Sequence, residues 1–121
     1  MAVAVRDKIV ERTARFLEPG EQVQAVFPAQ TFNGYWALLS PLIVLFKSSY
    51  RAVVVTDRRI AVFDTGRFSS ANAKSLLRSL PRSTQIGPVS GLWAKVESLG
   101  ERLFVHKRFH KDVTQADAFR P

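Results

Sequence analysis

The chain contains no cysteine among its 121 residues, so it has no disulfide framework and no thiolate for metal binding or nucleophilic catalysis. It also lacks a long apolar run. The longest, Tyr35–Phe46, has 12 residues and is interrupted by a serine and a proline, whereas a membrane-spanning helix needs about 20. Residues 1–16 are no signal peptide, because charges at positions 6–8 break their apolar stretch. We expect a cytoplasmic protein that could associate with the inner face of the membrane.

Acidic residues are scarce: 10 stand against 18 lysines and arginines, which gives a formal net charge of +8. No acidic residue occurs from Thr65 to Val96. A positive field of this kind attracts phosphates on nucleic acid or anionic lipid, and acidic protein partners. The alternative is that the charge only keeps the surface soluble. The candidate anion-binding residues are Arg67, Lys74, Arg78, Arg82, Lys107, Arg108 and Lys111.

Catalytic motifs are missing as well. The chain has no G-x-S-x-G, no P-loop and no G-x-G-x-x-G, and its carboxylates form no evident acid–base pair. On a helix, the i,i+4 spacing of His106 and His110 would suit two metal ligands. The surrounding basic residues would repel a cation, however, and only Asp112 or Glu101 offers a third ligand. We therefore expect no enzyme, no cofactor and no bound metal.

The apolar fraction of 46% and the charged fraction of 23% are those of one folded globular domain. Its clearest pattern is a pair of apolar runs, Ala52–Val55 and Ile60–Phe63, on either side of the polar corner 56–59. Valine and isoleucine favour strands. Both runs are apolar at odd and even positions, which predicts a hairpin buried on more than one side, inside a sheet. Asp57 should accept the backbone N–H two residues on, in a type I turn.

Two elements are predicted before this hairpin. Residues 3–17 show apolar side chains at helical spacing, and a Pro-Gly pair follows. This helix lies on the domain's own core or, since it is basic, on a membrane surface. Gln22–Gln30 alternates apolar and polar residues, which predicts a half-buried strand. Pro28 should put the far end of that strand at an edge or a bulge.

Three further elements follow the hairpin. Apolar residues at i, i+3, i+4 and i+7 predict a short helix over 73–80, ended by Pro81. Arg82–Ile86 could be a strand. Leu92–Leu99 alternates, and a turn at Gly100 pairs it with Arg102–Val105 as a second hairpin.

The C-terminal segment carries a helical stripe of Phe109, Val113, Ala116 and Phe119. This stripe predicts a helix that starts near Lys107. The alternative is a later start, with Asp112 and Gln115 as N-cap and capping box.

Tyr35–Phe46 fits neither the helical nor the strand period. Pro41 forbids a regular helix through its middle, so we expect an irregular or helical piece to Ser40 and then a strand or extended arm, Leu42–Phe46. The stretch either contacts a bilayer or a partner, or it forms core or a dimer contact. The candidate contact residues are Tyr35, Trp36, Leu39, Leu42 and Phe46.

Aromatic residues beside basic ones offer a third type of contact. Trp93 with Lys95, and Phe104 with Arg102 and His106, could stack the bases of a single-stranded nucleic acid. The alternative is that Trp93 and Phe104 belong to the core.

The segment VVVTDRRIAVFD resembles the central hairpin of the bacterial pleckstrin-homology-like (PH-like) domains, in which a strand ends in a Thr-Asp-basic-Arg turn. Residues 17–21, LEPGE, resemble the Leu-x-x-Gly-Glu lead-in to the first strand of the same family. Val105–Asp117 stands where those domains carry their closing helix. The resemblance covers most of residues 17–119 and is sharpest over Val53–Phe63.

The resemblance implies an α+β, mainly antiparallel fold: a bent sheet or partly open barrel of about seven strands, capped by a C-terminal helix. The single domain 1–121 would comprise an extra N-terminal helix over 1–18, a sheet over 21–106 and the closing helix over 107–119. Tyr35–Phe46 and Leu76–Leu80 have no place in the family pattern. The basic loop of eukaryotic inositol-lipid binders is not recognisable, so phosphoinositide binding is not carried over.

These observations together favour a non-enzymatic binding module, peripheral at an anionic membrane surface or in a membrane-associated assembly. The first alternative is a homo-oligomeric protein–protein interaction module. The second is a nucleic-acid-binding protein, which ranks below both.

Overall fold

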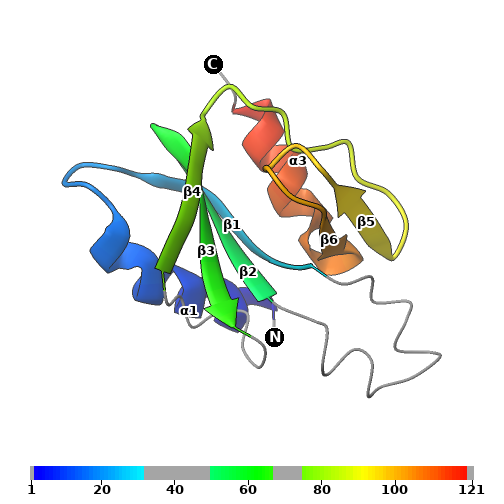
Figure 1. The fold of residues 1–121 in the computed structure, drawn as a ribbon, viewed down its shortest axis with the longest axis horizontal. Helices are drawn as coiled ribbons and strands as arrows, with labels where there is room; N and C mark the ends of the chain where they lie inside the picture. The colour runs from blue at the N-terminus through cyan, green and yellow to red at the C-terminus, as the bar shows by residue number, and fades with distance from the viewer. Residues whose placement is uncertain (1, 32–49, 67–74, 120–121) are drawn as a thin grey trace.

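The structure is a computed structural model and describes residues 2–31, 50–66 and 75–119. Six antiparallel strands form one sheet in the order β4-β3-β2-β1-β6-β5, curled into a half-barrel that carries helices from both ends of the chain (Figure 1). The predicted α+β class is therefore confirmed. The elements are α1 (Ala2–Thr13), η1 (Ala14–Phe16), β1 (Val23–Gln30), β2 (Tyr50–Thr56), β3 (Arg59–Gly66), β4 (Ser75–Pro81), β5 (Trp93–Val96), β6 (Leu103–His106), η3 (Lys107–Phe109) and α3 (His110–Ala118).

The hairpin of β2 and β3 lies in the middle of the sheet, with Val53 opposite Val62 and Val55 opposite Ile60. All side chains over 52–55 and 60–63 are fully buried. Because successive side chains of a strand point to opposite faces, they enter two separate clusters. One contains Val53, Val55, Ile60 and Val62, and the other contains Ala52, Val54, Ala61 and Phe63. The prediction of a two-sided, internal hairpin is confirmed.

The C-terminal helix covers the first of these faces. Phe109, Val113 and Ala116 are buried against it, and the helical segment begins at Lys107 as predicted. The later start is excluded, because α3 already begins at His110 and Asp112 lies within its first turn. The Asp112 carboxylate accepts hydrogen bonds from Arg6. Phe119 was expected to complete the apolar stripe, but it is 58% exposed because α3 ends one residue before it.

The N-terminal helix covers the second face. Ile9 is fully buried in the cluster with Val26 and Phe63, and the ring of Phe16 in η1 lies 5.1 Å from that of Phe63. The predicted helix is confirmed, and its apolar side packs on the domain's own sheet. With both faces covered, β1 is buried on both sides from Ala25 onward, and the prediction of a half-buried strand is wrong for this part.

The turn between β2 and β3 is closed by Thr56. Its Oγ1 accepts the backbone N–H groups of Arg58 and Arg59, both at 3.2 Å. The Asp57 carboxylate accepts the backbone N–H of Gln22 at 2.9 Å instead. The predicted role of Asp57 is therefore wrong. The Thr56 hydroxyl accepts the backbone N–H groups of the turn. Asp57 instead joins the turn to the segment just before β1.

The side chain of Glu21 is buried beside the same turn and joins the turn to the segment that leads into β1. Its carboxylate accepts hydrogen bonds from the Thr56 hydroxyl (2.6 Å), from Arg59 Nε (2.9 Å) and from the backbone N–H of Glu18 (3.0 Å). Burial alone would raise the pKa of Glu21, but these hydrogen bonds and the charge of Arg59 outweigh it. The pKa falls from 4.5 to about 2.

The region around 73–80 corrects the sequence prediction. Residues 75–81 form the edge strand β4, paired with β3 through Ile60 opposite Leu80 and Val62 opposite Arg78. The backbone groups of the buried strand β3 need hydrogen-bond partners on this side, and pairing with β4 supplies them. Tertiary pairing thus overrides the helical spacing of the leucines. Leu80 packs on the core, whereas Leu76 and Leu77 are 37% and 41% exposed.

The predicted strand Arg82–Ile86 is also wrong. The backbone N–H groups of Ile86 and Gly87 both donate to the Asp117 carboxylate at 2.8 Å, and the Ile86 carbonyl accepts the Ser98 hydroxyl. Side chains therefore supply the hydrogen-bond partners of these backbone groups, where pairing with another strand was expected. The predicted hairpin of β5 and β6 is confirmed, with Ala94 and Val96 on the buried side.

The buried carboxylate generates a stability prediction. Because its pKa is lower in the folded state, Glu21 stabilises the fold above pH 4.5, and this contribution is lost as the pH falls to about 2. The loss amounts to roughly 3 kcal/mol at about 1.4 kcal/mol per pKa unit. Urea unfolding of Glu21→Gln should show about 3 kcal/mol less stability than the parent at pH 7, and the two proteins should converge toward pH 2.

The matched control is Glu97→Gln, which removes an exposed carboxylate paired with Lys95. It should change the unfolding free energy by less than about 1 kcal/mol. An undiminished dependence of stability on acid pH in Glu21→Gln would contradict the assignment.

Candidate functional site: an aromatic, basic pocket

A cavity of about 450 Å³ lies where the end of β1, the start of β2, the β5–β6 hairpin and η3 meet. Its origin is a local opening of the sheet, since β1 and β6 are paired only at Gln30 opposite Phe104. Continued pairing would place Pro28 opposite His106, yet both line the cavity. The described residues that line it are Pro28, Ala29, Gln30, Tyr50, Trp93, Phe104, His106, Arg108 and Phe109.

Pro28 stands where this pairing has ended. It has no backbone N–H to donate to a ladder, and over this part of β1 only β2 is paired with the strand. The strand continues past Pro28 to Gln30, however, which is paired with both Tyr50 and Phe104. The prediction that Pro28 puts the far end of the strand at an edge or a bulge is therefore wrong.

Aromatic side chains form much of the pocket wall. Phe104 and Phe109 are buried, and Trp93 is half-buried, with its ring edge-to-face against the imidazole of His106 at 4.9 Å between centroids. Lys95 is exposed and pairs with Glu97 at 3.4 Å. Trp93 and Phe104 were expected either in the core or on a stacking surface. Both line this pocket.

His106 contacts both Trp93 and Arg108. Its Nδ1 accepts the backbone N–H of Arg108 at 3.2 Å, so a neutral ring carries its proton on Nε2, which is then a donor. Burial, aided by the charges of Arg108 and His110, lowers the pKa of His106 below 6.5. The imidazole is therefore neutral at pH 7 and offers one N–H.

The two histidines do not share a helix face, so the condition for the i,i+4 ligand spacing is not met. His106 is the last residue of β6, whereas His110 opens α3 and directs Nε2 to the Val105 carbonyl at 3.2 Å. Within the described residues, no group of three metal-ligating side chains comes together.

The structure sorts the predicted anion-binding residues into three groups. Arg67 and Lys74 lie outside the described residues. Arg78 and Arg82 are engaged inside the fold. Arg78 binds the Glu101 carboxylate and the Leu99 carbonyl. Buried Arg82 donates to Gln24 Oε1 and to the Ala116 carbonyl. The third group, Lys107, Arg108 and Lys111, is exposed and forms no ion pair within the described part of the chain.

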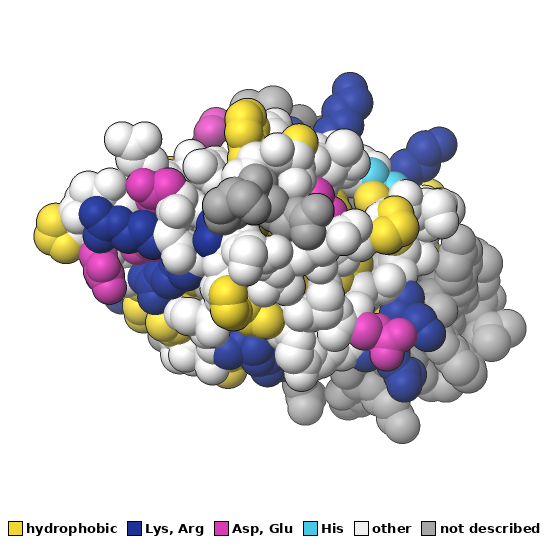
Figure 2. Space-filling view, turned by 90° about the horizontal axis from the view of Figure 1, so that it is seen from above, with side chains coloured by type: hydrophobic (Ala, Val, Ile, Leu, Met, Phe, Trp, Pro, Cys, Tyr) yellow, Lys and Arg dark blue, Asp and Glu magenta, His cyan; other side chains and the backbone are white. Residues whose placement is uncertain are grey.

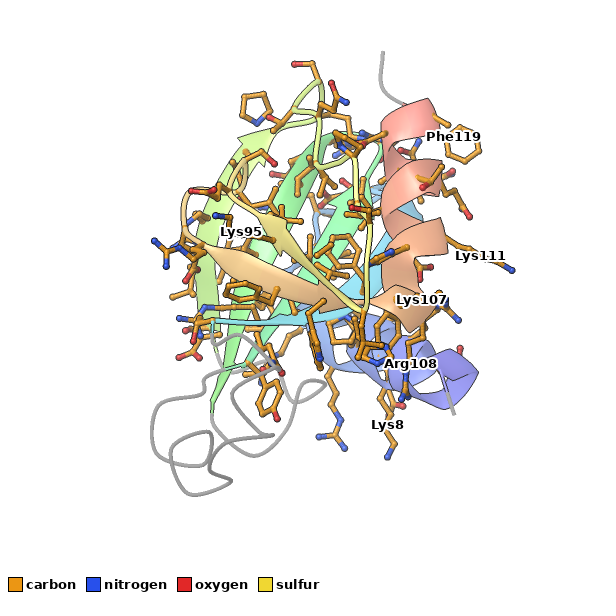
Figure 3. The ribbon with its side chains drawn as sticks, turned by 90° about the vertical axis from the view of Figure 1, so that its right-hand side faces the viewer. Lys8, Lys95, Lys107, Arg108, Lys111 and Phe119 are labelled. Carbon is orange, nitrogen blue, oxygen red and sulfur yellow. The ribbon has the colours of Figure 1, made fainter. Side chains whose placement is uncertain are left out.

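A fourth cation, Lys8, was missed in the sequence analysis. Arg6 fastens α1 to the C-terminal helix, because its guanidinium donates to both oxygens of Asp112 and lies 5.6 Å from the centroid of the Phe109 ring. Lys8 follows two residues later on α1, and in the view of Figure 3 its side chain projects from the same edge of the molecule as Arg108. Helical spacing could not have revealed this, since it depends on packing between the two ends of the chain.

We call Lys8, Lys107, Arg108 and Lys111 the basic face. They come from α1, η3 and the first turn of α3, and Figure 3 shows them around the contact between these elements. Figure 2 likewise shows lysine or arginine side chains beside histidine at one edge of the molecule. Arg108 belongs to both the basic face and the pocket lining. The pocket thus opens beside a positive surface, and its described lining contains no carboxylate.

The candidate contact residues Tyr35, Trp36, Leu39, Leu42 and Phe46 lie outside the described residues, as does the predicted arm 42–46. No helix in the described ranges is long and apolar enough to cross a membrane.

The fold and the site together define an α+β half-barrel domain with an aromatic pocket next to a basic face. No family model, curated protein or solved structure matches this chain.

The imidazole environment can be tested by titration. The pKa of His106, followed by NMR through its ring C–H resonances, should lie below 6.5. Arg108→Gln should raise it, because a positive neighbour is removed while the burial remains. Arg102→Gln, one residue before the start of β6, should leave the pKa unchanged. A midpoint at or above 6.5 in the parent, or no rise in Arg108→Gln, would count against this geometry.

Proposed function

We propose that the protein is a non-enzymatic binding module that works at an anionic membrane surface or in a membrane-associated assembly. The observation that carries the proposal is the basic face. Its four cations are exposed and have no carboxylate partner among the described residues, whereas Arg6, Arg51, Arg59 and Arg78 are held in ion pairs. Charges left unpaired on one surface are available to an anionic partner.

We also propose that the domain is PH-like. The two motifs that carry the resemblance are in contact, because Glu21 of the LEPGE lead-in binds Thr56 and Arg59 of the TDRR turn. A curled antiparallel sheet covered by a C-terminal helix is the arrangement that the resemblance implies. A shared scaffold alone assigns no ligand, so the function is argued from the surface.

Magnitudes suggest how such a surface would work. Each basic residue near an anionic bilayer contributes about 1 kcal/mol. Four therefore give about 4 kcal/mol, which corresponds to millimolar affinity. Useful binding needs a further, apolar contribution, and the segment Tyr35–Phe46 is our candidate for it.

Co-sedimentation with phosphatidylcholine vesicles and with phosphatidylglycerol-containing vesicles, at low and moderate salt, tests the proposal. The parent should bind only the anionic vesicles, and salt should weaken the binding. Lys107→Gln/Lys111→Gln should reduce the vesicle affinity by about thirtyfold, since two cations are removed.

The matched control is Lys95→Gln/Arg102→Gln, which removes the same charge elsewhere; Figure 3 shows Lys95 on the other side of the molecule from Lys107 and Lys111. This control variant should reduce the vesicle affinity by less than about threefold. Equal losses in the two double variants would argue for net charge and against the basic face. No binding by the parent at low salt would refute the membrane proposal.

A further inference from the structure

We propose that the pocket between β1 and β6 binds a small amphipathic anion, one carboxylate or phosphate group on a flat aromatic body. This ligand is a soluble molecule, and the inference does not depend on membrane binding. It rests on the volume, the walls and the polar groups of the cavity.

The volume fits a small molecule. Ligand pockets commonly enclose roughly 300–1,000 Å³, and this cavity has about 450 Å³. It is also built from several parts of the fold, because β1, β2, the β5–β6 hairpin and η3 all contribute to its lining. A site assembled from packed strands is largely preformed, which limits the entropy lost on binding.

The walls favour a flat, apolar body. Four aromatic residues, Tyr50, Trp93, Phe104 and Phe109, are among the residues that line the pocket, together with Pro28 and Ala29. Phe104 and Phe109 are at most 8% exposed, and Phe109 belongs to the core cluster under the C-terminal helix. Aromatic rings gain from stacked or edge-to-face contact with another aromatic system, beyond the area they bury.

The polar groups favour an anion. Arg108 supplies the one formal charge in the described lining, and its guanidinium lies 5.9 Å from the centroid of the Phe109 ring. His106 Nδ1 is already bonded to the Arg108 backbone, so the neutral ring has Nε2–H left to donate. An arginine and a neutral N–H donor, with no carboxylate among the described lining residues, match a carboxylate or phosphate oxygen.

Titration calorimetry with 2-naphthoate and with its neutral counterpart 2-naphthalenemethanol tests the proposal. Both probes carry the same ring system and differ in charge. The parent should bind 2-naphthoate at least about tenfold more tightly than the alcohol. In a Trp36→Phe background, where Trp93 is the only tryptophan, 2-naphthoate should shift the indole N–H resonance of Trp93.

Arg108→Gln should abolish the preference for the anion, whereas Arg102→Gln should retain it. Circular dichroism checks that both variants are folded. Trp93→Ala is the second variant. It should weaken the binding of both probes, because it removes an aromatic side chain from the pocket lining and leaves the charge of Arg108 in place. Equal binding of the two probes by the parent, or an unshifted Trp93 resonance, would overturn the proposal.

A separate arm distinguishes a soluble ligand from a lipid. Dihexanoyl-phosphatidylglycerol, used below its micelle concentration, should not displace 2-naphthoate. Displacement by this lipid but not by dihexanoyl-phosphatidylcholine would identify the pocket as a lipid headgroup site and refute the aromatic-acid assignment. Since no vesicle is present, these results are independent of the co-sedimentation result.

Discussion

Burial of the central hairpin on both faces is the constraint on which the rest of the structure depends. Residues 52–55 and 60–63 expose nothing to solvent, so each face of the sheet needs a cover. Burial of these side chains stabilises the fold by roughly 25 cal/mol for each Å² of apolar surface removed from water. The C-terminal helix covers one face and α1 covers the other, and Arg6 joins the two helices through Asp112. The two terminal helices, which cover opposite faces of the sheet, are thus in contact through this ion pair.

The pocket and the basic face both follow from this arrangement. The sheet curls toward the C-terminal helix, and β1 stays paired with β2 while it separates from β6 near Pro28. Aromatic side chains from both sides of the opening line the space that remains. The contact between α1 and η3 brings Lys8 to the side of the molecule that carries Lys107 and Lys111. Pocket and charge therefore meet at Arg108, although neither proposal requires the other.

The fate of the arginines shows how a strongly basic chain divides its charge between structure and surface. Arg59 is held by Glu21 beside the turn, and Arg51 and Arg78 share the carboxylate of Glu101. Arg82 is buried on neutral acceptors. A buried charge is expensive unless it is hydrogen-bonded, so these guanidinium groups hold segments together and are not available to ligands. Among the described residues, Lys8, Lys107, Arg108 and Lys111 are exposed cations for which no ion pair is found.

Local sequence patterns were enough to predict the central hairpin, the β5–β6 hairpin and the two terminal helices, because each depends on side-chain periodicity within one segment. The α+β class came from the resemblance of these segments to PH-like domains. The tertiary structure decided the rest. Residues 75–81 form a strand because β3 needs a hydrogen-bonding neighbour on that side. In the turn, Thr56 accepts the backbone N–H groups, whereas Asp57 accepts the N–H of Gln22. The tertiary structure also decided the site. From the sequence, Arg78 and Arg82 were candidate anion-binding residues just as Lys107 and Lys111 were. Only tertiary packing determines which cations are engaged in hydrogen bonds and ion pairs inside the fold and which face solvent.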